Sequence, residues 1–150
     1  MNHSILTIKG KQFRAYPPEE GVAVIRTIAE HRWPMTINEA FALRDQFGWK
    51  PAPDDGRYFV TSVSSGNEDG SIGLDITDRS LVSEISFNLS TAFRQDVPAE
   101  IQGAVQDGQV SYVNALKLLY WAGDAESDQT VASTQWILPS RASVIISATR

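Results

Sequence analysis

Histidine, cysteine and serine are the residues on which nucleophilic catalysis most often depends, and this chain offers few useful arrangements of them. It has no cysteine, and its two histidines are His3 and His31. His3 lies near the start of the chain, and His31 follows an expected helix, whose negative end suits an imidazole. No serine lies in a Gly-x-Ser-x-Gly turn. We therefore predict that the protein is not an enzyme and has no catalytic residue.

Carboxylates are the other groups that could do chemistry, and they occur in three short clusters. None of these clusters has the central glycine and terminal bidentate glutamate of a calcium-binding EF-hand loop. Gly66 and Gly70 lack the Lys-Ser/Thr sequence that follows the glycines of a phosphate-binding loop. We predict no metal and no cofactor, and the clusters are either turn residues or contacts to a partner. They comprise Asp54 and Asp55, Glu68 and Asp69, and Asp124, Glu126 and Asp128.

The overall charge limits the class of partner. The chain has 150 residues and a formal net charge of -5. Nucleic-acid-binding proteins usually carry a basic patch, so we predict no nucleic-acid partner. An acidic surface favours encounter with a basic protein, although a charge of this size also serves solubility alone.

The length and apolar content of the chain limit the number of domains and the kinds of segment that it can contain. We expect one domain over residues 1–150, in which residues 1–16 form either a flexible arm or a short strand. The start of the chain has no signal-peptide pattern, and no segment approaches the roughly 20 apolar residues that span a bilayer. We therefore expect a cytoplasmic protein with no membrane partner.

The expected elements begin with two helices. Pro18, followed by two glutamates, suits a helix N-terminus, and an apolar residue then recurs every three or four positions. A second helix is predicted at Thr36, because Thr36 and Glu39 match a capping box. Gly48 is expected to end that helix.

The rest of the sequence predicts strands on both sides of one further helix. Residues 57–64, 71–77 and 81–89 predict a three-strand meander, with Ile76 among the inward residues of the second strand. A helix that Gly103 and Gly108 divide into two pieces is expected next, with Gly123 as its cap and an acidic loop over 124–128. Residues 131–138 and 143–148 predict a final hairpin. The order α-α-β-β-β-α-β-β predicts an α+β fold with a mainly antiparallel sheet of about five strands and helices packed beside it.

Four tryptophans, Trp33, Trp49, Trp121 and Trp136, lie at element ends or in the last hairpin. Tryptophan is common both in small cores and at the centres of protein interfaces. The motifs Trp33-Pro34-Met35-Thr36 and Phe47-Gly48-Trp49, with a Leu-rich segment over 116–123 and the later sequence Trp136-Ile137-Leu138-Pro139, resemble an uncharacterised family of small actinobacterial proteins. That family resembles the immunity proteins of polymorphic toxin and type VII secretion systems.

The resemblance implies a function without catalysis: binding a cognate toxin and occluding its basic active-site cleft. The order of elements is also similar to the secretion-chaperone fold, so a small acidic chaperone that holds an export substrate is the alternative. The oligomeric state is left open. The expected partner-binding residues are the carboxylates of the three clusters and two aromatic anchors: Trp49, Asp54, Asp55, Tyr58, Glu68, Asp69, Asp124, Glu126 and Asp128.

Overall fold

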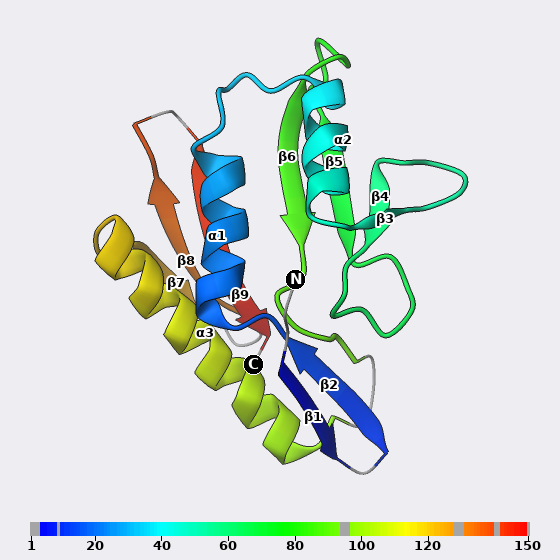
Figure 1. Ribbon diagram of the computed structural model, residues 1–150. Helices are drawn as coiled ribbons and strands as arrows, with labels where there is room; N and C mark the ends of the chain where they lie inside the picture. The colour runs from blue at the N-terminus through cyan, green and yellow to red at the C-terminus, as the bar shows by residue number, and fades with distance from the viewer. Residues whose placement is uncertain (1–3, 9, 94–96, 128–130, 140–141, 150) are drawn as a thin grey trace. The chain divides into compact units, whose positions relative to one another are not determined.

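A computed structural model describes residues 4–8, 10–93, 97–127, 131–139 and 142–149 (Figure 1). Within these ranges the fold is α+β, with antiparallel sheets, and the predicted order of helices and strands is confirmed with further short strands added. The elements are β1 (Ser4–Ile8), β2 (Lys11–Ala15), α1 (Pro18–Ala29), α2 (Ile37–Gln46), β3 (Lys50–Pro51), β4 (Tyr58–Val60), β5 (Gly70–Leu74), β6 (Val82–Phe87), α3 (Ala99–Leu119), β7 (Asp124–Ser127), β8 (Val131–Ile137) and β9 (Ser143–Thr149).

The chain divides into two compact units. Unit 1 consists of the described residues within Met1–Leu6, Gln12–Tyr16 and Arg32–Ala92, and unit 2 of those within Thr7–Lys11, Pro17–His31 and Phe93–Arg150. The two-stranded sheet of β1 and β2 contributes residues to both units. That the chain behaves as one domain in unfolding stays a prediction.

Helix α2 of unit 1 begins and ends where the sequence predicts. Thr36 is its N-cap, and the hydroxyl of Thr36 accepts a hydrogen bond from the Glu39 backbone N–H at 3.2 Å. The same hydroxyl donates to the Glu39 carboxylate at 3.1 Å. Gly48 follows the helix with a φ of 75°, a left-handed conformation that glycine adopts without strain. The predicted N-cap at Thr36 is confirmed.

The sheet of unit 1 has four antiparallel strands in the order β3-β4-β5-β6, and the predicted meander is confirmed in β4, β5 and β6. The register of β5 and β6 shifts between Gly73 and Leu74, where the structure has an irregularity. Strand β5 ends at Leu74, so Ile76 lies in the following turn and is 94% exposed. The expectation that Ile76 faces the core is therefore wrong, because the alternation stops with the strand.

Aromatic rings form the core of unit 1. Trp49 stacks on Phe59 with ring centroids 4.6 Å apart, and Phe47 and Phe87 contact the indole from other directions. The Phe59 ring lies against Gly70, its neighbour across the β4–β5 pair, so closely that a Cβ there would collide with the ring. A residue without a side chain is therefore required at position 70.

Two helices cover one face of the sheet in unit 2. Figure 1 shows α1 and α3 on the same side of β7, β8 and β9, and both helices contact β9. Gly21 in α1 brings the helices together, because the Tyr112 ring of α3 occupies the space that a Cβ would need. The Tyr112 hydroxyl donates to the Pro17 carbonyl at 3.2 Å. This bond fixes the start of α1 against α3.

Helix α3 differs from its prediction at three places. It is one helix of 21 residues, so Gly103 and Gly108 do not divide it. It ends at Leu119 with Tyr120 as its C-cap, three residues before Gly123. Gly123 instead lies against Trp136, where a Cβ would approach the indole to 2.7 Å. The glycine serves a close approach of backbone to ring rather than a cap.

The three-stranded sheet of unit 2 has the order β7-β8-β9 and is antiparallel throughout. Strands β8 and β9 confirm the predicted hairpin. The expected loop over 124–128 is wrong, because Asp124–Ser127 pairs with β8 as strand β7. Trp136 is fully buried, and its indole N–H donates to the Trp121 carbonyl at 2.7 Å. Trp136 is thus a core residue of this unit.

Each described helix is too short or too polar to cross a bilayer.

Candidate functional site

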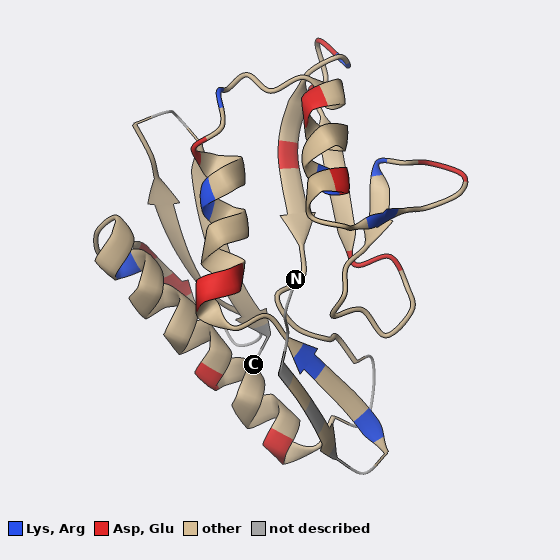
Figure 2. Ribbon diagram, viewed as in Figure 1, with Lys and Arg blue, Asp and Glu red and all other residues tan. Residues whose placement is uncertain are grey.

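The carboxylates predicted to contact a partner do not form one surface. Figure 2 shows acidic residues in the loops on both sides of β4 in unit 1, and others on α3 and β7 in unit 2. Asp128 lies outside the described residues. The other predicted carboxylates are Asp54 and Asp55 before β4, Glu68 and Asp69 after β4, and Asp124 and Glu126 on β7.

Asp55 holds its own loop together. Its carboxylate accepts hydrogen bonds from the backbone N–H and from the guanidinium of Arg57, both at 3.0 Å. These bonds favour the charged form and lower the pKa of Asp55 from 3.8 to about 2. Asp54 beside it is exposed. The negative charge of Asp55 is therefore matched within the loop.

Asp69 has a similar role at the other end of β4. Its carboxylate accepts hydrogen bonds from the Thr61 backbone N–H at 2.7 Å and from the Thr61 hydroxyl at 2.6 Å. The backbone N–H of Asp69 donates to the Phe59 carbonyl at 3.1 Å. These bonds close the loop between β4 and β5, while the neighbouring Glu68 is exposed.

The turn between β5 and β6 uses two further carboxylates in the same way. Asp75 accepts hydrogen bonds from the hydroxyl and backbone N–H of Thr77, which lower the pKa of Asp75. Asp78 accepts the corresponding bonds from Ser80, and the pKa of Asp78 is lowered as well. Four carboxylates of unit 1 thus stabilise loops.

The two predicted aromatic anchors differ in exposure. Tyr58 on β4 is 49% exposed, which is compatible with a contact to a partner. Trp49 is 4% exposed and lies among the aromatic rings of the core. Trp49 is therefore corrected to a core residue, because a partner could reach its ring only by opening unit 1.

The side of the β7-β8-β9 sheet that faces away from α1 and α3 offers a different surface, which we call the β7–β9 face. Its most exposed apolar side chains are Ile137, which is 65% exposed, and Ile145, which is 59% exposed. The alternate residues Thr134, Trp136, Val144 and Ile146 are buried. The face consists of Asp124, Glu126, Val131, Ser133, Gln135, Ile137, Ser143, Ile145 and Ser147.

The strand register orders this face in rows. Asp124 lies opposite Gln135, which in turn lies opposite Ile145. Glu126 lies opposite Ser133 in the next row. Carboxylates therefore occupy the β7 side of the face and aliphatic side chains the β8 and β9 side. The described residues of the three strands include no lysine or arginine, and neither carboxylate takes part in an ion pair there.

The two isoleucines of the β7–β9 face are not among the contacts predicted from the sequence. The predicted hairpin over 131–138 and 143–148 has no outward face assigned to either strand. The signal was the run of three aliphatic residues Val144, Ile145 and Ile146 in a strand. Because neighbouring side chains of a strand point to opposite faces, such a run must expose one of them or bury both faces.

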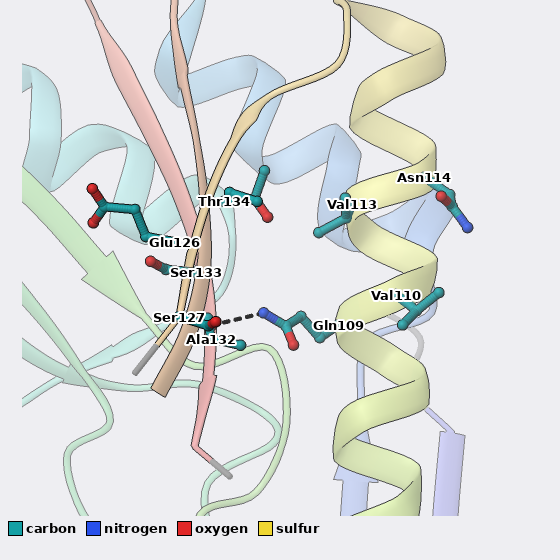
Figure 3. A pocket seen from close by; sticks show the side chains of 10 residues that line it. Gln109, Val110, Val113, Asn114, Glu126, Ser127, Ala132, Ser133 and Thr134 are labelled. Carbon is teal, nitrogen blue, oxygen red and sulfur yellow. Dashed lines mark hydrogen bonds between the residues drawn. The ribbon is translucent and has the colours of Figure 1, made fainter. Parts of the chain in front are cut away.

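A cavity of about 340 Å³ lies between α3 and the first two strands of the same sheet (Figure 3). Gln109 and Val113 point from α3 toward the strands, and the Gln109 amide donates to the Ala132 carbonyl at 2.7 Å. Glu126 lies on the side of the strands away from α3 and is the one ionisable residue of the lining. The lining consists of Gln109, Val110, Val113, Asn114, Ala125, Glu126, Ser127, Ala132, Ser133 and Thr134.

His31 lines a second, shallow cavity of about 400 Å³ at the end of α1. The other residues that line this cavity interact with one another. Arg26 and Glu30 form an ion pair at 3.4 Å, and the Thr27 hydroxyl donates to the Ala23 carbonyl at 2.8 Å. Glu30 also accepts a hydrogen bond from the Tyr120 hydroxyl at 3.4 Å. Burial and the charge of Glu30 raise the pKa of Tyr120. These contacts join α1 to the end of α3.

Across the described ranges, histidine, aspartate and glutamate side chains form no group of three that could hold a metal ion. The sequence model of a family described as a family of unknown function, DUF6301, matches residues 19–150. The match begins within α1 and includes every later helix and strand. No curated protein and no solved structure matches the chain.

Proposed function

The chain belongs to the DUF6301 family, and we propose that it is an immunity protein that binds a cognate toxin domain in the cytoplasm and occludes its active site. The observation that carries the proposal is the β7–β9 face. It combines Ile137 of β8 and Ile145 of β9, both more than half exposed, with two carboxylates on β7 of the same sheet. Exposed aliphatic side chains of this size next to charged ones are typical of protein interfaces.

The proposed mechanism is occlusion rather than chemistry. Asp124 and Glu126 attract a basic substrate-binding cleft, which accelerates encounter and excludes acidic partners. Ile137 and Ile145 then supply the apolar area that water must leave when the complex forms. Because the face belongs to a hydrogen-bonded sheet with Trp136 beneath it, its shape is set before the partner arrives, which limits the entropic cost of binding.

Co-expression with a toxin domain encoded beside this gene tests the proposal. The protein is expected to restore growth and to co-purify with the toxin. The double variant Asp124→Lys and Glu126→Lys is expected to lose rescue and to bind at least about tenfold more weakly.

The matched control is the double variant Glu100→Lys and Asp107→Lys, which makes the same change of charge on exposed positions of α3. It should bind and rescue like the parent. A neighbouring toxin that the protein neither binds nor inhibits would refute the proposal, and so would a gene with no toxin beside it.

A secretion chaperone is the second candidate, and the cavity between α3 and β7 supports it. A chaperone holds an extended export segment and leaves the folded partner active. Measuring the activity of the folded toxin with an excess of this protein separates the two functions. Inhibition supports the immunity function, whereas full activity with retained binding supports the chaperone function.

A further inference from the structure

The first observation is the position of β7 at the edge of its sheet. Strand β7 pairs with β8 on one side, and the sheet order β7-β8-β9 gives it no second partner among the described strands. In an antiparallel pair every second residue directs its N–H and C=O groups away from the partner strand. All four residues of β7 are exposed, so these groups face water. An edge of this kind accepts a further strand.

The second observation is the cavity that runs beside this edge. The strands contribute small side chains to its α3 side, Ala125 and Ser127 from β7 and Ala132 and Thr134 from β8. Helix α3 contributes Val113 and the exposed Val110. An extended chain placed along β7 would direct every second side chain into this space, between the strand and the helix. The lining favours small or aliphatic side chains there.

The third observation is the charge on the opposite side of the same strand. Asp124 and Glu126 alternate with Ala125 and Ser127, so they lie on the β7–β9 face, away from the helix. Side chains of an added strand that point to that face would lie next to the two carboxylates. Lysine or arginine is favoured at those positions, and aspartate or glutamate is disfavoured.

These observations also argue against a second copy of the chain as the added strand. If β7 paired with β7 of another molecule, carboxylates would lie close to carboxylates across the new pair. Like charges opposite each other destabilise a sheet. Charged residues on an edge strand are a common protection against such pairing.

We propose that an extended basic segment of the partner adds to β7 as a fourth strand, with small aliphatic residues toward α3 and basic residues toward Asp124 and Glu126. The inference rests on the proposed function only in that the partner is a protein. It assigns to β7 a role in recognition, and it predicts a sequence pattern in the partner: basic and small aliphatic residues in alternation.

A short synthetic peptide of alternating lysine and valine, added to the full chain, tests this inference without any toxin. The peptide is expected to shift the backbone NMR signals of Asp124–Ser127. Glu126→Lys should weaken its binding about tenfold, whereas the control Glu100→Lys should not. A peptide of alternating glutamate and valine should not bind.

Methylation of the peptide backbone distinguishes strand addition from simple charge attraction. In an added strand only every second N–H of the peptide donates to β7. Methylating the N–H groups of one alternate set should therefore abolish binding, and methylating the other set should leave it within about twofold. Equal effects of the two methylation patterns, or no signal shift at β7, would overturn the inference and leave the carboxylates as edge protection only. Because no toxin is used, this result is independent of the growth-rescue result.

Discussion

In unit 1, Asp55 and Asp69 accept hydrogen bonds from the loops beside β4, whereas in unit 2 Asp124 and Glu126 project from an exposed strand. The side chains are of the same chemical class and differ in what surrounds them. A carboxylate that accepts backbone N–H groups stabilises its loop, and its charge is already matched. A carboxylate on an exposed edge strand without such hydrogen bonds carries a charge that a group on another molecule can match.

The comparison shows why a count of acidic residues is a poor guide to a binding surface. Six of the carboxylates predicted as contacts are described, and they divide between loop stabilisation, simple exposure and the β7–β9 face. Sequence proximity paired Asp54 with Asp55 and Glu68 with Asp69, yet in each pair one residue is bonded and the other exposed. Backbone geometry, rather than composition, therefore decides which carboxylate of each pair is available for contact with a partner.

The two units agree in how their cores are built. In each, a glycine gives space to an aromatic ring on a neighbouring element: Gly70 to Phe59 in unit 1, and Gly21 to Tyr112 in unit 2. Both positions tolerate no Cβ without movement of a buried ring. Each unit therefore contains a position at which a methyl group would displace a buried aromatic ring.

Gly21→Ala is expected to have the largest effect of the substitutions considered. The added methyl group would collide with Tyr112 and separate α1 from α3, which should lower the free energy of unfolding by about 3 kcal/mol. Urea denaturation followed by circular dichroism measures the change. Gly103→Ala in α3 is the control: nothing lies within 4 Å of its new Cβ, and the helix should gain about 1 kcal/mol.

Gly70→Ala makes the corresponding change in unit 1 and tests the single-domain prediction. If residues 1–150 unfold as one domain, both alanine variants should move the same single transition. Two transitions, each moved by only one of the variants, would contradict that prediction.

Asp69→Asn should destabilise the protein by about 2 kcal/mol, because the charge-assisted bonds to Thr61 become neutral ones in a partly buried loop. Glu68→Gln removes the same charge from the exposed neighbour and should change stability by less than about 0.5 kcal/mol. Thermal unfolding of both variants measures the difference. Equal effects would show that Asp69 stabilises nothing that Glu68 does not.

Asp55→Asn should have a smaller effect that depends on pH. The folded pKa of Asp55, about 2, lies below the ordinary value of 3.8, so the charged form favours the folded state. This contribution is complete above about pH 4 and is lost as the pH falls through about 2. The difference between parent and variant in urea midpoint should therefore shrink as the pH is lowered from 5 to 2. A difference that stays constant over that range would contradict the assigned role of Arg57.

Local signals in the sequence were sufficient for much of this fold. The Thr36 capping box and Gly48 predict the ends of α2, because a cap depends on residues within one helical turn. Strand β7 could not be predicted in this way, because Asp124–Ser127 becomes a strand only through its pairing with β8. Trp49 was misplaced for a related reason: its burial depends on Phe59 and Phe87, which are distant in sequence.

In the candidate site, too, local features could be predicted from the sequence, whereas features that depend on long-range contacts could not. Asp124 and Glu126 were predicted as contacts from their charge alone, and the structure adds the strand that holds them and the isoleucines beside them. The cavity beside α3 has no signature in the sequence, since its lining comes from segments that meet only in the folded unit.

Hydrogen–deuterium exchange of the proposed complex with a toxin domain tests the central claim, that the partner binds the β7–β9 face of unit 2 rather than the acidic loops of unit 1. The account predicts slower amide exchange in β7, β8 and β9 on binding, with unchanged exchange in the unit 1 loops over 52–57 and 61–69. Protection of those unit 1 loops, with unchanged exchange in β7, β8 and β9, would contradict it.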